Sequence, residues 1–244
     1  MVDRSKLTDF PQPSVAVDVA VLTTLRPHAA GDPGRLAVLV VDTKEKGRAL
    51  PGRFLRERQT VAESVADVLR LKAGLAEVRA EPRLLRVFDD PDRDYRGWTL
   101  SLAHALTLAS ELMRQAGGEL VGVTRSGRLE PGETLLYDHD AIVREAAAAI
   151  RERYERLPDP DGLLEHPFTM AELRSVHEAV IGERLLKDTF RRRMESQLQP
   201  LLNGEGQPVL RSDRGRPAQV YERQIEAEPA EASLRRVRLP RAGR

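Results

Sequence analysis

The segment Leu50–Leu75 (LPGRFLRERQTVAESVADVLRLKAGL) combines basic side chains with the predicted start of a helix. Thr60 and Glu63 form a T-x-x-E capping box, in which each side chain binds a backbone N–H group that the first helical turn leaves free. Helix N-termini and arginine side chains both suit phosphate oxygens, so the segment predicts a phosphate-binding site. The basic residues before the helix are Arg53, Arg56 and Arg58.

The spacing of apolar residues predicts the elements that position this segment. Val61, Val65, Val68 and Leu69 recur with a helical period, which predicts a helix with one side packed on the core. Gly74 is expected to end that helix in the left-handed conformation. Runs rich in β-branched and apolar residues predict strands over Val15–Thr24, Arg35–Thr43, Glu81–Asp89, Trp98–Leu108 and Glu119–Thr124.

A further helix is predicted over Tyr137–Arg156, with Asp138 as its N-cap and His139 contributing to the cap. Strands and helices that mix without strict βαβ alternation indicate an α+β fold, a mixed sheet with flanking helices. His104, inside a strand, is expected to be a structural residue. Trp98, at the start of that strand, is expected to lie in the core; stacking on a nucleotide base is the alternative.

A different pattern follows the helix-breaking cluster Leu157–Gly162 (LPDPDG), where we place a domain boundary and expect a hinge. Apolar spacing predicts helices over Ala171–Gly182 and Lys187–Gln199. Short strands over Val209–Arg211 and Gln219–Glu222 flank a basic turn. This order predicts a winged helix-turn-helix. The predicted parts are a domain over 1–156, the winged helix over 157–226 and a disordered basic tail over 227–244.

The second of these helices carries an apolar stripe that fixes its outward side. Phe190 and Met194 are spaced to face the core, so the polar residues between them project outward. Recognition helices meet base edges and phosphates in the major groove, and arginine binds both. Asp188 and Glu195 favour the alternative, a solvated charged helix. The predicted DNA contacts are Lys187, Thr189, Arg192 and Arg193 on the helix and Arg214 and Arg216 on the wing.

Composition limits the classes of partner. The net charge is +1, so attraction to nucleic acid must come from local clusters of charge. The chain has no cysteine, which excludes disulfides and thiolate zinc sites and fits a reducing cytoplasm. No apolar run reaches the roughly 18 residues of a membrane span, and we expect a soluble cytoplasmic protein without a membrane partner.

The Leu50–Leu75 segment resembles the Nudix box, G-x5-E-x7-R-E-U-x-E-E-x-G-U, where U is a bulky aliphatic residue. Aligned on Gly74 and Leu75, the inner aliphatic position falls on Leu69, which keeps it. Magnesium needs hard oxygen ligands, and the residues at the glutamate positions cannot supply them. The resemblance therefore implies a fold without catalytic residues or a metal cofactor. The residues at the glutamate positions are Gln59, Val68, Leu71 and Lys72.

Four further stretches resemble the NrtR family, the Nudix-related transcriptional regulators of NAD metabolism. They are DRDYRGW at Asp92–Trp98, YDHDAI at Tyr137–Ile142, LLKDTFRRRM at Leu185–Met194 and GRPAQVY at Gly215–Tyr221.

This resemblance implies a homodimeric repressor on operator DNA of NAD biosynthesis or salvage genes, which ADP-ribose releases. The first domain would then be the effector-binding domain, and two winged helices would read an inverted repeat. The residues that the resemblance and the basic loop assign to the ligand are Gly52, Arg53, Phe54, Arg56, Arg93, Asp94 and Arg96.

Two other functions compete with this one. An ADP-ribose pyrophosphatase with an appended interaction domain would need carboxylates near the pocket. The acids of the box segment are Glu57, Glu63 and Asp67. A structural, partner-binding protein is the third reading, and salt-sensitive DNA binding would set it aside.

Overall fold

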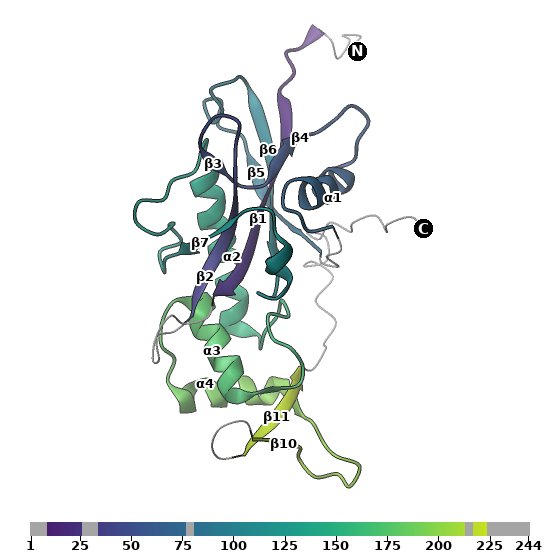
Figure 1. The fold of residues 1–244 in the computed structure, drawn as a ribbon, viewed down its shortest axis with the longest axis vertical. Helices are drawn as coiled ribbons and strands as arrows, with labels where there is room; N and C mark the ends of the chain where they lie inside the picture. Colours follow the sequence, from purple (N-terminus) through teal and green to yellow (C-terminus); the bar gives the residue numbers. More distant parts are fainter. Residues whose placement is uncertain (1–8, 26–33, 77–80, 213–216, 224–244) are drawn as a thin grey trace, which may run out of the picture.

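The computed structural model describes residues 9–25, 34–76, 81–212 and 217–223. Figure 1 shows an elongated molecule, with a sheet and two helices at one end and a smaller helical part with short strands at the other. No helix within the described ranges is long and apolar enough to cross a membrane.

The first part is built on a mixed sheet. Its main path is β3-β2-β1-β6-β5, while β4 pairs with β1 and β7 pairs with β2. The central strand β1 runs parallel to β6 and antiparallel to β2 and β4. The expected mixed sheet is therefore present. The strands are β1 Ser14–Leu25, β2 Arg35–Asp42, β3 Arg48–Ala49, β4 Gly52–Phe54, β5 Arg83–Phe88, β6 Thr99–Thr107 and β7 Glu119–Val123.

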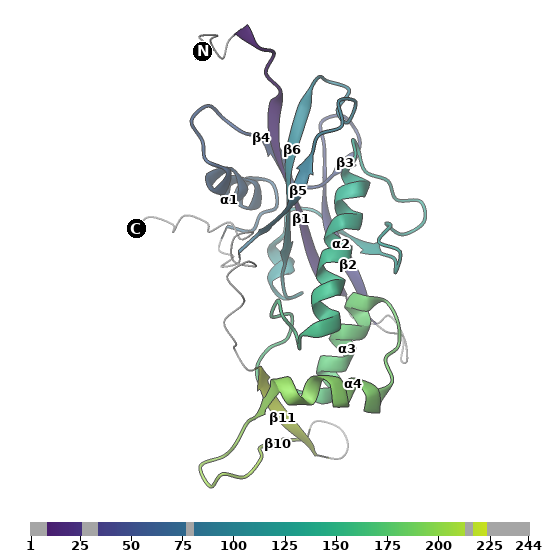
Figure 2. The ribbon, with the colours of Figure 1, turned by 180° about the vertical axis from the view of Figure 1, so that it is seen from behind.

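Both faces of β1 are buried, since successive side chains of a strand point to opposite sides. Val17, Val19 and Val21 pack in one apolar cluster with the helix α1 (Val61–Leu71). Ala20 and Leu22 pack in a second cluster with α2 (His139–Arg156). The two helices therefore cover opposite faces of the sheet (Figures 1 and 2).

The start of α1 confirms the predicted capping box. The Glu63 amide donates to the Thr60 hydroxyl at 3.2 Å, and the Thr60 amide donates to the Glu63 carboxylate at 2.8 Å. Gly74 adopts the left-handed conformation, with φ of 69°, as its place after the helix predicted. The box segment therefore folds as its sequence indicates.

The second part contains two helices packed on short strands. Among the described residues, the strand path is β10-β11-β8, with β9 also paired to β11. Its core contains Leu173 and Phe190 from the two helices and Phe168 and Tyr221 from the strands. The elements are β8 Phe168–Thr169, α3 Met170–Ile181, α4 Lys187–Met194, β9 Leu198–Pro200, β10 Leu210–Arg211 and β11 Ala218–Arg223.

The second helix is shorter than its predicted range Lys187–Gln199. It ends at Met194, and a 3-10 turn over Glu195–Gln197 leads into β9. Leu198 has the apolar spacing of a continuing helix, but it pairs with β11 and is buried as part of a strand. Strand pairing therefore overrides the local helical pattern.

Helix α3 belongs to both parts of the molecule. Val180 packs in the cluster beneath α2, whereas Leu173 packs in the core of the winged part. The Arg151 guanidinium on α2 donates to the carbonyls of Val180 at 2.9 Å, Arg125 at 2.8 Å and Thr124 at 3.0 Å. These contacts fix the end of α3 to the first part.

The expected hinge at Leu157–Gly162 is held by a buried carboxylate. Asp159 is fully buried and accepts hydrogen bonds from the Tyr154 hydroxyl at 2.7 Å and the amides of Leu163 at 2.8 Å and Leu164 at 3.0 Å. These bonds oppose the expected hinge motion, because movement of this segment would break them.

Candidate effector site and nucleic-acid interface

The predicted phosphate-binding segment is partly neutralised by its own acid. Asp67 on α1 accepts hydrogen bonds from Arg53 at 2.5 Å, Arg70 at 2.8 Å and Gln59 at 3.0 Å. The Arg70 hydrogen bond is the largest effect on Asp67 and holds the pKa of its carboxyl below the ordinary value. Arg53 is therefore mostly buried against Asp67, although the sequence placed it in the ligand pocket.

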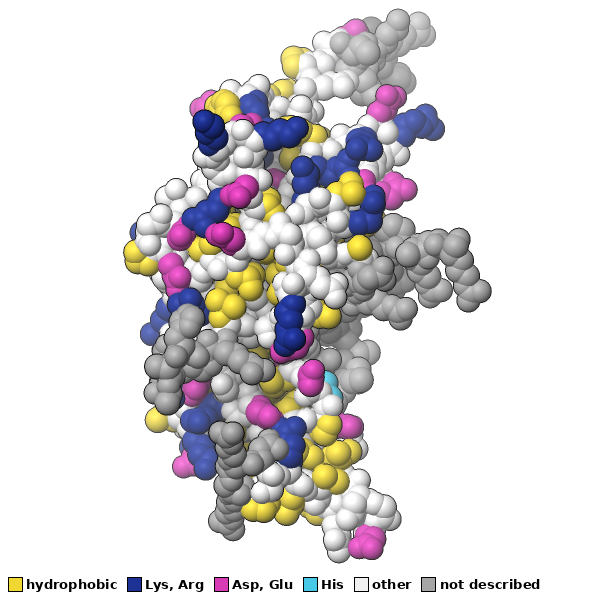
Figure 3. All heavy atoms as spheres, viewed as in Figure 1, with side chains coloured by type: hydrophobic (Ala, Val, Ile, Leu, Met, Phe, Trp, Pro, Cys, Tyr) yellow, Lys and Arg dark blue, Asp and Glu magenta, His cyan; other side chains and the backbone are white. Residues whose placement is uncertain are grey.

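Arg56 and Arg58 remain exposed on the segment that leads into α1. Figure 3 shows basic side chains gathered over this segment and α1. Arg58 has a positive φ of 59°, which a residue with a side chain rarely adopts. The loop therefore presents two guanidinium groups beside the N-terminus of a helix, an arrangement that suits phosphate.

Gly52 has a steric role. A Cβ atom at this position would lie 1.9 Å from the Asp18 Oδ1 atom. Only glycine therefore lets β4 pair with β1 beside this carboxylate.

Asp18 is the centre of a buried polar network. Its carboxylate accepts a hydrogen bond from the Ser101 hydroxyl at 2.6 Å and lies 3.7 Å from Arg93 and 3.6 Å from the His139 Nε2 atom. Burial raises its pKa, but His139, Ser101 and Arg93 outweigh burial and hold the pKa of Asp18 below the ordinary value. The carboxylate is therefore kept charged inside the fold.

The start of α2 follows the expectation in part. Asp138 is the N-cap residue, as predicted, but its carboxylate does not cap the helix, because Arg93 donates to it at 2.9 Å and 2.5 Å. His139 is not part of a cap either: its Nδ1 atom accepts a hydrogen bond from the Leu50 amide at 3.0 Å. Both side chains instead connect α2 to the box segment and to the Asp92–Trp98 loop.

His104 is fully buried in β6, where its Nδ1 atom lies 2.8 Å from the Leu102 carbonyl. Burial is the main cause that lowers the pKa of this imidazole. The expected structural role is confirmed.

An exposed aromatic surface lies beside this network. Tyr95 is 74% exposed and Trp98 is 48% exposed, while Phe54 at the end of β4 is also exposed. The expectation that Trp98 lies in the core is therefore wrong. Its carbonyl accepts a hydrogen bond from the Ser14 amide at 3.0 Å, so the backbone is fixed to β1 while the indole faces outward.

Arg96 connects Phe54 at the end of β4 with Tyr137 before α2. Its guanidinium lies 4.6 Å from the centre of the Tyr137 ring and 5.2 Å from that of Phe54, within cation–π range. It also donates to Asp94 at 2.7 Å and Glu45 at 3.3 Å. The structure thus brings together two predicted ligand residues, Phe54 and Arg96, which lie 42 positions apart in the chain.

Sequence reasoning did not assign Tyr137 and Glu45 to this site. The Tyr137 hydroxyl donates to Glu45 at 2.7 Å, and its ring stacks with Tyr95 at 6.2 Å. Burial and the Glu45 carboxylate raise the pKa of Tyr137. Tyr137 also has a positive φ of 61°, and such backbone strain often occurs at ligand sites. The YDHDAI match was the available signal. We call Phe54, Tyr95, Arg96 and Tyr137 the aromatic site.

The carboxylates near the box do not gather as metal ligands. Within the described parts of the chain, no group of three or more His, Cys, Asp or Glu residues is placed to hold a metal ion. Glu63 is bonded to Thr60 in the capping box, and Asp67 is bonded to Arg53 and Arg70.

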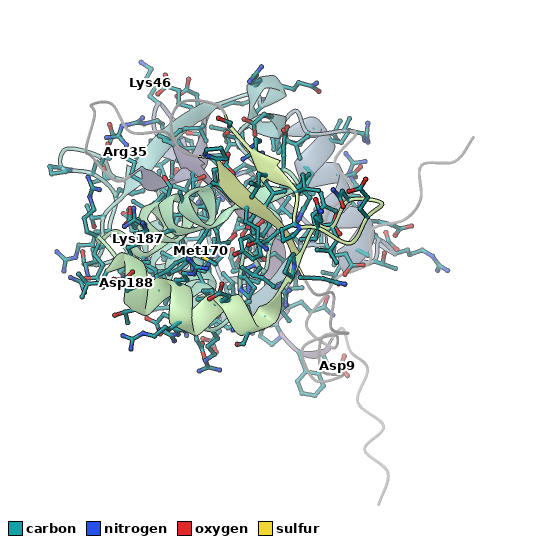
Figure 4. All side chains as sticks on the ribbon, turned by 90° about the horizontal axis from the view of Figure 1, so that it is seen from below. Asp9, Arg35, Lys46, Met170, Lys187 and Asp188 are labelled. Atoms are coloured by element: carbon teal, nitrogen blue, oxygen red, sulfur yellow. The ribbon has the colours of Figure 1, made fainter. Side chains whose placement is uncertain are left out.

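The winged part presents α4 at the far end of the molecule. Phe190 and Met194 are buried, as their spacing predicted. Figure 4 labels Lys187 and Asp188 at the N-terminal end of α4. Arg214 and Arg216 lie outside the described residues. The other predicted DNA contacts are all exposed: Lys187, Thr189, Arg192 and Arg193.

Comparisons with known proteins agree with this architecture. Residues 162–222 match the family described as the NrtR DNA-binding winged helix domain. Over 198 residues, the chain is 25% identical to a protein of Acinetobacter baylyi named ADPR responsive transcriptional repressor NtrR; the match covers 77% of this chain and 74% of that protein.

Two solved structures have a similar fold over nearly the whole chain. Shewanella oneidensis NrtR in complex with a 27mer DNA has a TM-score of 0.64 at 23% identity, covering 91% of this chain and 96% of that one. A MutT/nudix family protein from Enterococcus faecalis has a TM-score of 0.69 at 20% identity, with coverage of 91% and 90%.

The fold and its two surfaces define a Nudix-like domain followed by a DNA-binding winged helix, which confirms the fold class expected from the sequence. Residues 162–222 thus match the winged helix domain of NrtR, and the chain as a whole is similar in sequence and fold to NrtR proteins.

Proposed function

We propose that this protein is an ADP-ribose-responsive repressor of NAD biosynthesis or salvage genes. The observation that carries the proposal is α4, which shares a core with β11 and leaves Lys187, Thr189 and Arg192 exposed. A recognition helix beside a wing is suited to the major groove. The name of the Acinetobacter baylyi relative supports both repression and the ADP-ribose response.

The DNA partner is a duplex operator read by a homodimer. Two copies related by a two-fold axis place two α4 helices on an inverted repeat. The solved complex of Shewanella oneidensis NrtR with a 27mer DNA supports duplex DNA as the partner. Because α3 is packed into both parts of the chain, the effector changes the arrangement of the two copies rather than bending one of them.

The effector occupies the surface between the aromatic site and the start of α1. The base stacks on exposed rings such as Phe54 and Tyr95, while Arg56 and the helix N-terminus neutralise the diphosphate. Arg93 and Asp94 are buried and bonded within the protein, so they position this surface. Arg56 and the N-terminus of α1 neutralise the charge of the diphosphate, which a metal ion does in a hydrolase. No metal cofactor is therefore required.

Hydrolysis is not part of the proposed function. The box positions that carry glutamates in hydrolases hold Gln59, Val68, Leu71 and Lys72. Asp67, an acid of the same segment, is bonded to three donors. The box positions that would hold a metal ion therefore supply no carboxylate for it, and Asp67 is not free to act as a general base.

The test is a titration of DNA duplexes with the full-length protein, with and without ADP-ribose. The duplexes are taken from the DNA upstream of the gene that encodes this protein. We expect sequence-specific, salt-sensitive binding that ADP-ribose weakens at least tenfold, which requires about 1.4 kcal/mol of difference between the two states. If ADP-ribose does not change the affinity for DNA, the effector assignment is wrong and the assignment of DNA binding stands.

The hydrolase alternative has its own assay. We expect no release of AMP from ADP-ribose in the presence of Mg²⁺. Metal-dependent AMP release that Asp67→Ala abolishes would show that the domain is an enzyme.

A further inference from the structure

Leu186 occupies a costly position at the start of α4. It is the N-cap residue of this helix, and its side chain is 79% exposed. A leucine side chain cannot accept a hydrogen bond from the first-turn amides, so serine, threonine, asparagine and aspartate are preferred at N-caps. The other helix of the winged part, α3, has a full capping box from Thr169 and Glu172.

The fold does not need an apolar side chain at this position. An exposed leucine gains nothing from the core, and α4 would be more stable with a polar cap. Residues that break a local rule without a structural gain are expected at functional sites. The place of Leu186 therefore points to an external partner.

The backbone around Leu186 is held in place. The Leu185 amide donates to the Glu178 carboxylate at 3.0 Å, and the Leu185 carbonyl accepts from Arg174 at 3.2 Å. Glu178 itself is buried. The Leu186 carbonyl accepts the first helical hydrogen bond, from Phe190 at 2.9 Å. The side chain is therefore presented from a fixed turn.

We propose that Leu186 contacts the 5-methyl group of a thymine in the major groove and so selects a T·A pair in each half-site. The inference rests on the proposed DNA binding. The thymine methyl is the apolar group that a base pair shows in the major groove, and apolar side chains recognise it. Lys187 and Thr189 next to it suit polar base edges and phosphates, which leaves the apolar contact to Leu186.

The first test is selection of bound duplexes from a randomised library by the full-length protein. We expect a T·A pair at one symmetric position of each half-site. Leu186→Ser is expected to lose that preference although its hydroxyl can cap α4 and raise the melting temperature. The matched control is Leu71→Ala, at a leucine of α1 that is 54% exposed, and it should keep the preference.

The second test replaces the selected thymine by deoxyuridine, which lacks only the methyl group. We expect about fourfold weaker binding by the wild-type protein, the effect of burying one methyl group. Leu186→Ser should bind both duplexes equally.

The outcomes separate this inference from the proposed function. The same base preference in the wild type and Leu186→Ser, or an equal effect of deoxyuridine on both, would overturn the Leu186 contact and leave DNA binding intact. Loss of dimers in Leu186→Ser with an unchanged base preference would assign the leucine to a protein contact and also overturn it. No duplex binding by the wild type at low salt would overturn both.

Discussion

Arg93 is the residue on which the polar centre of the first domain depends. Its guanidinium lies between the Asp138 carboxylate, at 2.5 Å, and the Asp18 carboxylate, at 3.7 Å. Both carboxylates come from elements far from the Asp92–Trp98 loop in sequence. A single side chain therefore fixes the loop that carries Tyr95 and Arg96 to β1 and α2.

Replacing Arg93 by methionine should destabilise the fold strongly. The change keeps an unbranched side chain but takes a cation from beside buried Asp18 and removes the partner of half-buried Asp138, so we expect a loss of about 3–5 kcal/mol. Urea unfolding at neutral pH measures it. Arg156→Met is the control, since Arg156 forms an exposed pair with Glu152, and it should change stability by less than about 1 kcal/mol. Equal effects would contradict a structural role for Arg93.

Phe54 tests the aromatic site without disturbing the core. Phe54→Ala removes a ring from the proposed stacking surface, and base–aromatic stacking contributes about 1–3 kcal/mol. We expect ADP-ribose affinity, measured by calorimetry, to fall about tenfold or more, while DNA affinity without the effector stays the same. Phe10→Ala, at another exposed phenylalanine, should have no effect. Unchanged affinity in Phe54→Ala would place the base elsewhere.

At the scale of elements, local sequence signals were sufficient where the cause is local. The capping box of Thr60 and Glu63, the left-handed Gly74 and the buried stripe of α4 follow from residues a few positions apart. Strand pairing depends on residues far apart in the chain. The apolar spacing therefore predicted a helix up to Gln199 and did not indicate that Leu198 belongs to β9.

The candidate site was less predictable for the same reason. The sequence assigned Arg53, Arg93 and Arg96 to one ligand site, but a sequence does not show which acid each arginine meets. Arg93 and Asp138 lie 45 positions apart. Trp98 was expected in the core because aromatic residues at strand starts often are buried, and only the pairing of β1 with β6 determines its outward direction.

Helix α4 offers a matched pair of arginines for testing recognition. Arg191 is held by Glu195 at 2.8 Å, whereas the neighbouring Arg192 is exposed and has the outward position. Arg192→Ala should weaken operator binding by about 1–3 kcal/mol. Arg191→Ala should have a smaller effect, because its charge is already neutralised. Fluorescence anisotropy at several salt concentrations measures both. Equal losses would show that α4 attracts DNA by its net charge alone.

At the scale of the whole molecule, His177 lies where the two domains meet. On α3, its ring packs 4.9 Å from that of Tyr154 on α2 and 5.0 Å from that of Phe190 on α4. Its Nε2 atom accepts a hydrogen bond from the Asp159 amide at 3.3 Å. His177 therefore contacts both domains and the segment that joins them. These contacts predict that the two domains unfold together.

His177 should make this unit sensitive to acid. Burial lowers the pKa of His177 from 6.5 to about 4. Between about pH 6.5 and pH 4, His177 is protonated in the unfolded chain but stays neutral in the folded protein. The free energy of unfolding therefore falls as the pH decreases through this window. The difference corresponds to at most about 3 kcal/mol. His177→Gln keeps an acceptor for the Asp159 amide but removes the titration.

The measurement is urea unfolding of the wild type and His177→Gln at several values between pH 7 and pH 4. Carboxylates titrate in both proteins, so their effect cancels in the difference between the two stabilities. We expect the wild type to lose its advantage over His177→Gln as the pH falls, with one unfolding transition for both domains. A difference that does not change with pH would exclude a buried, neutral His177. Two separate transitions would show that α3 does not join the domains, and a hinge at Leu157–Gly162 would then again be possible.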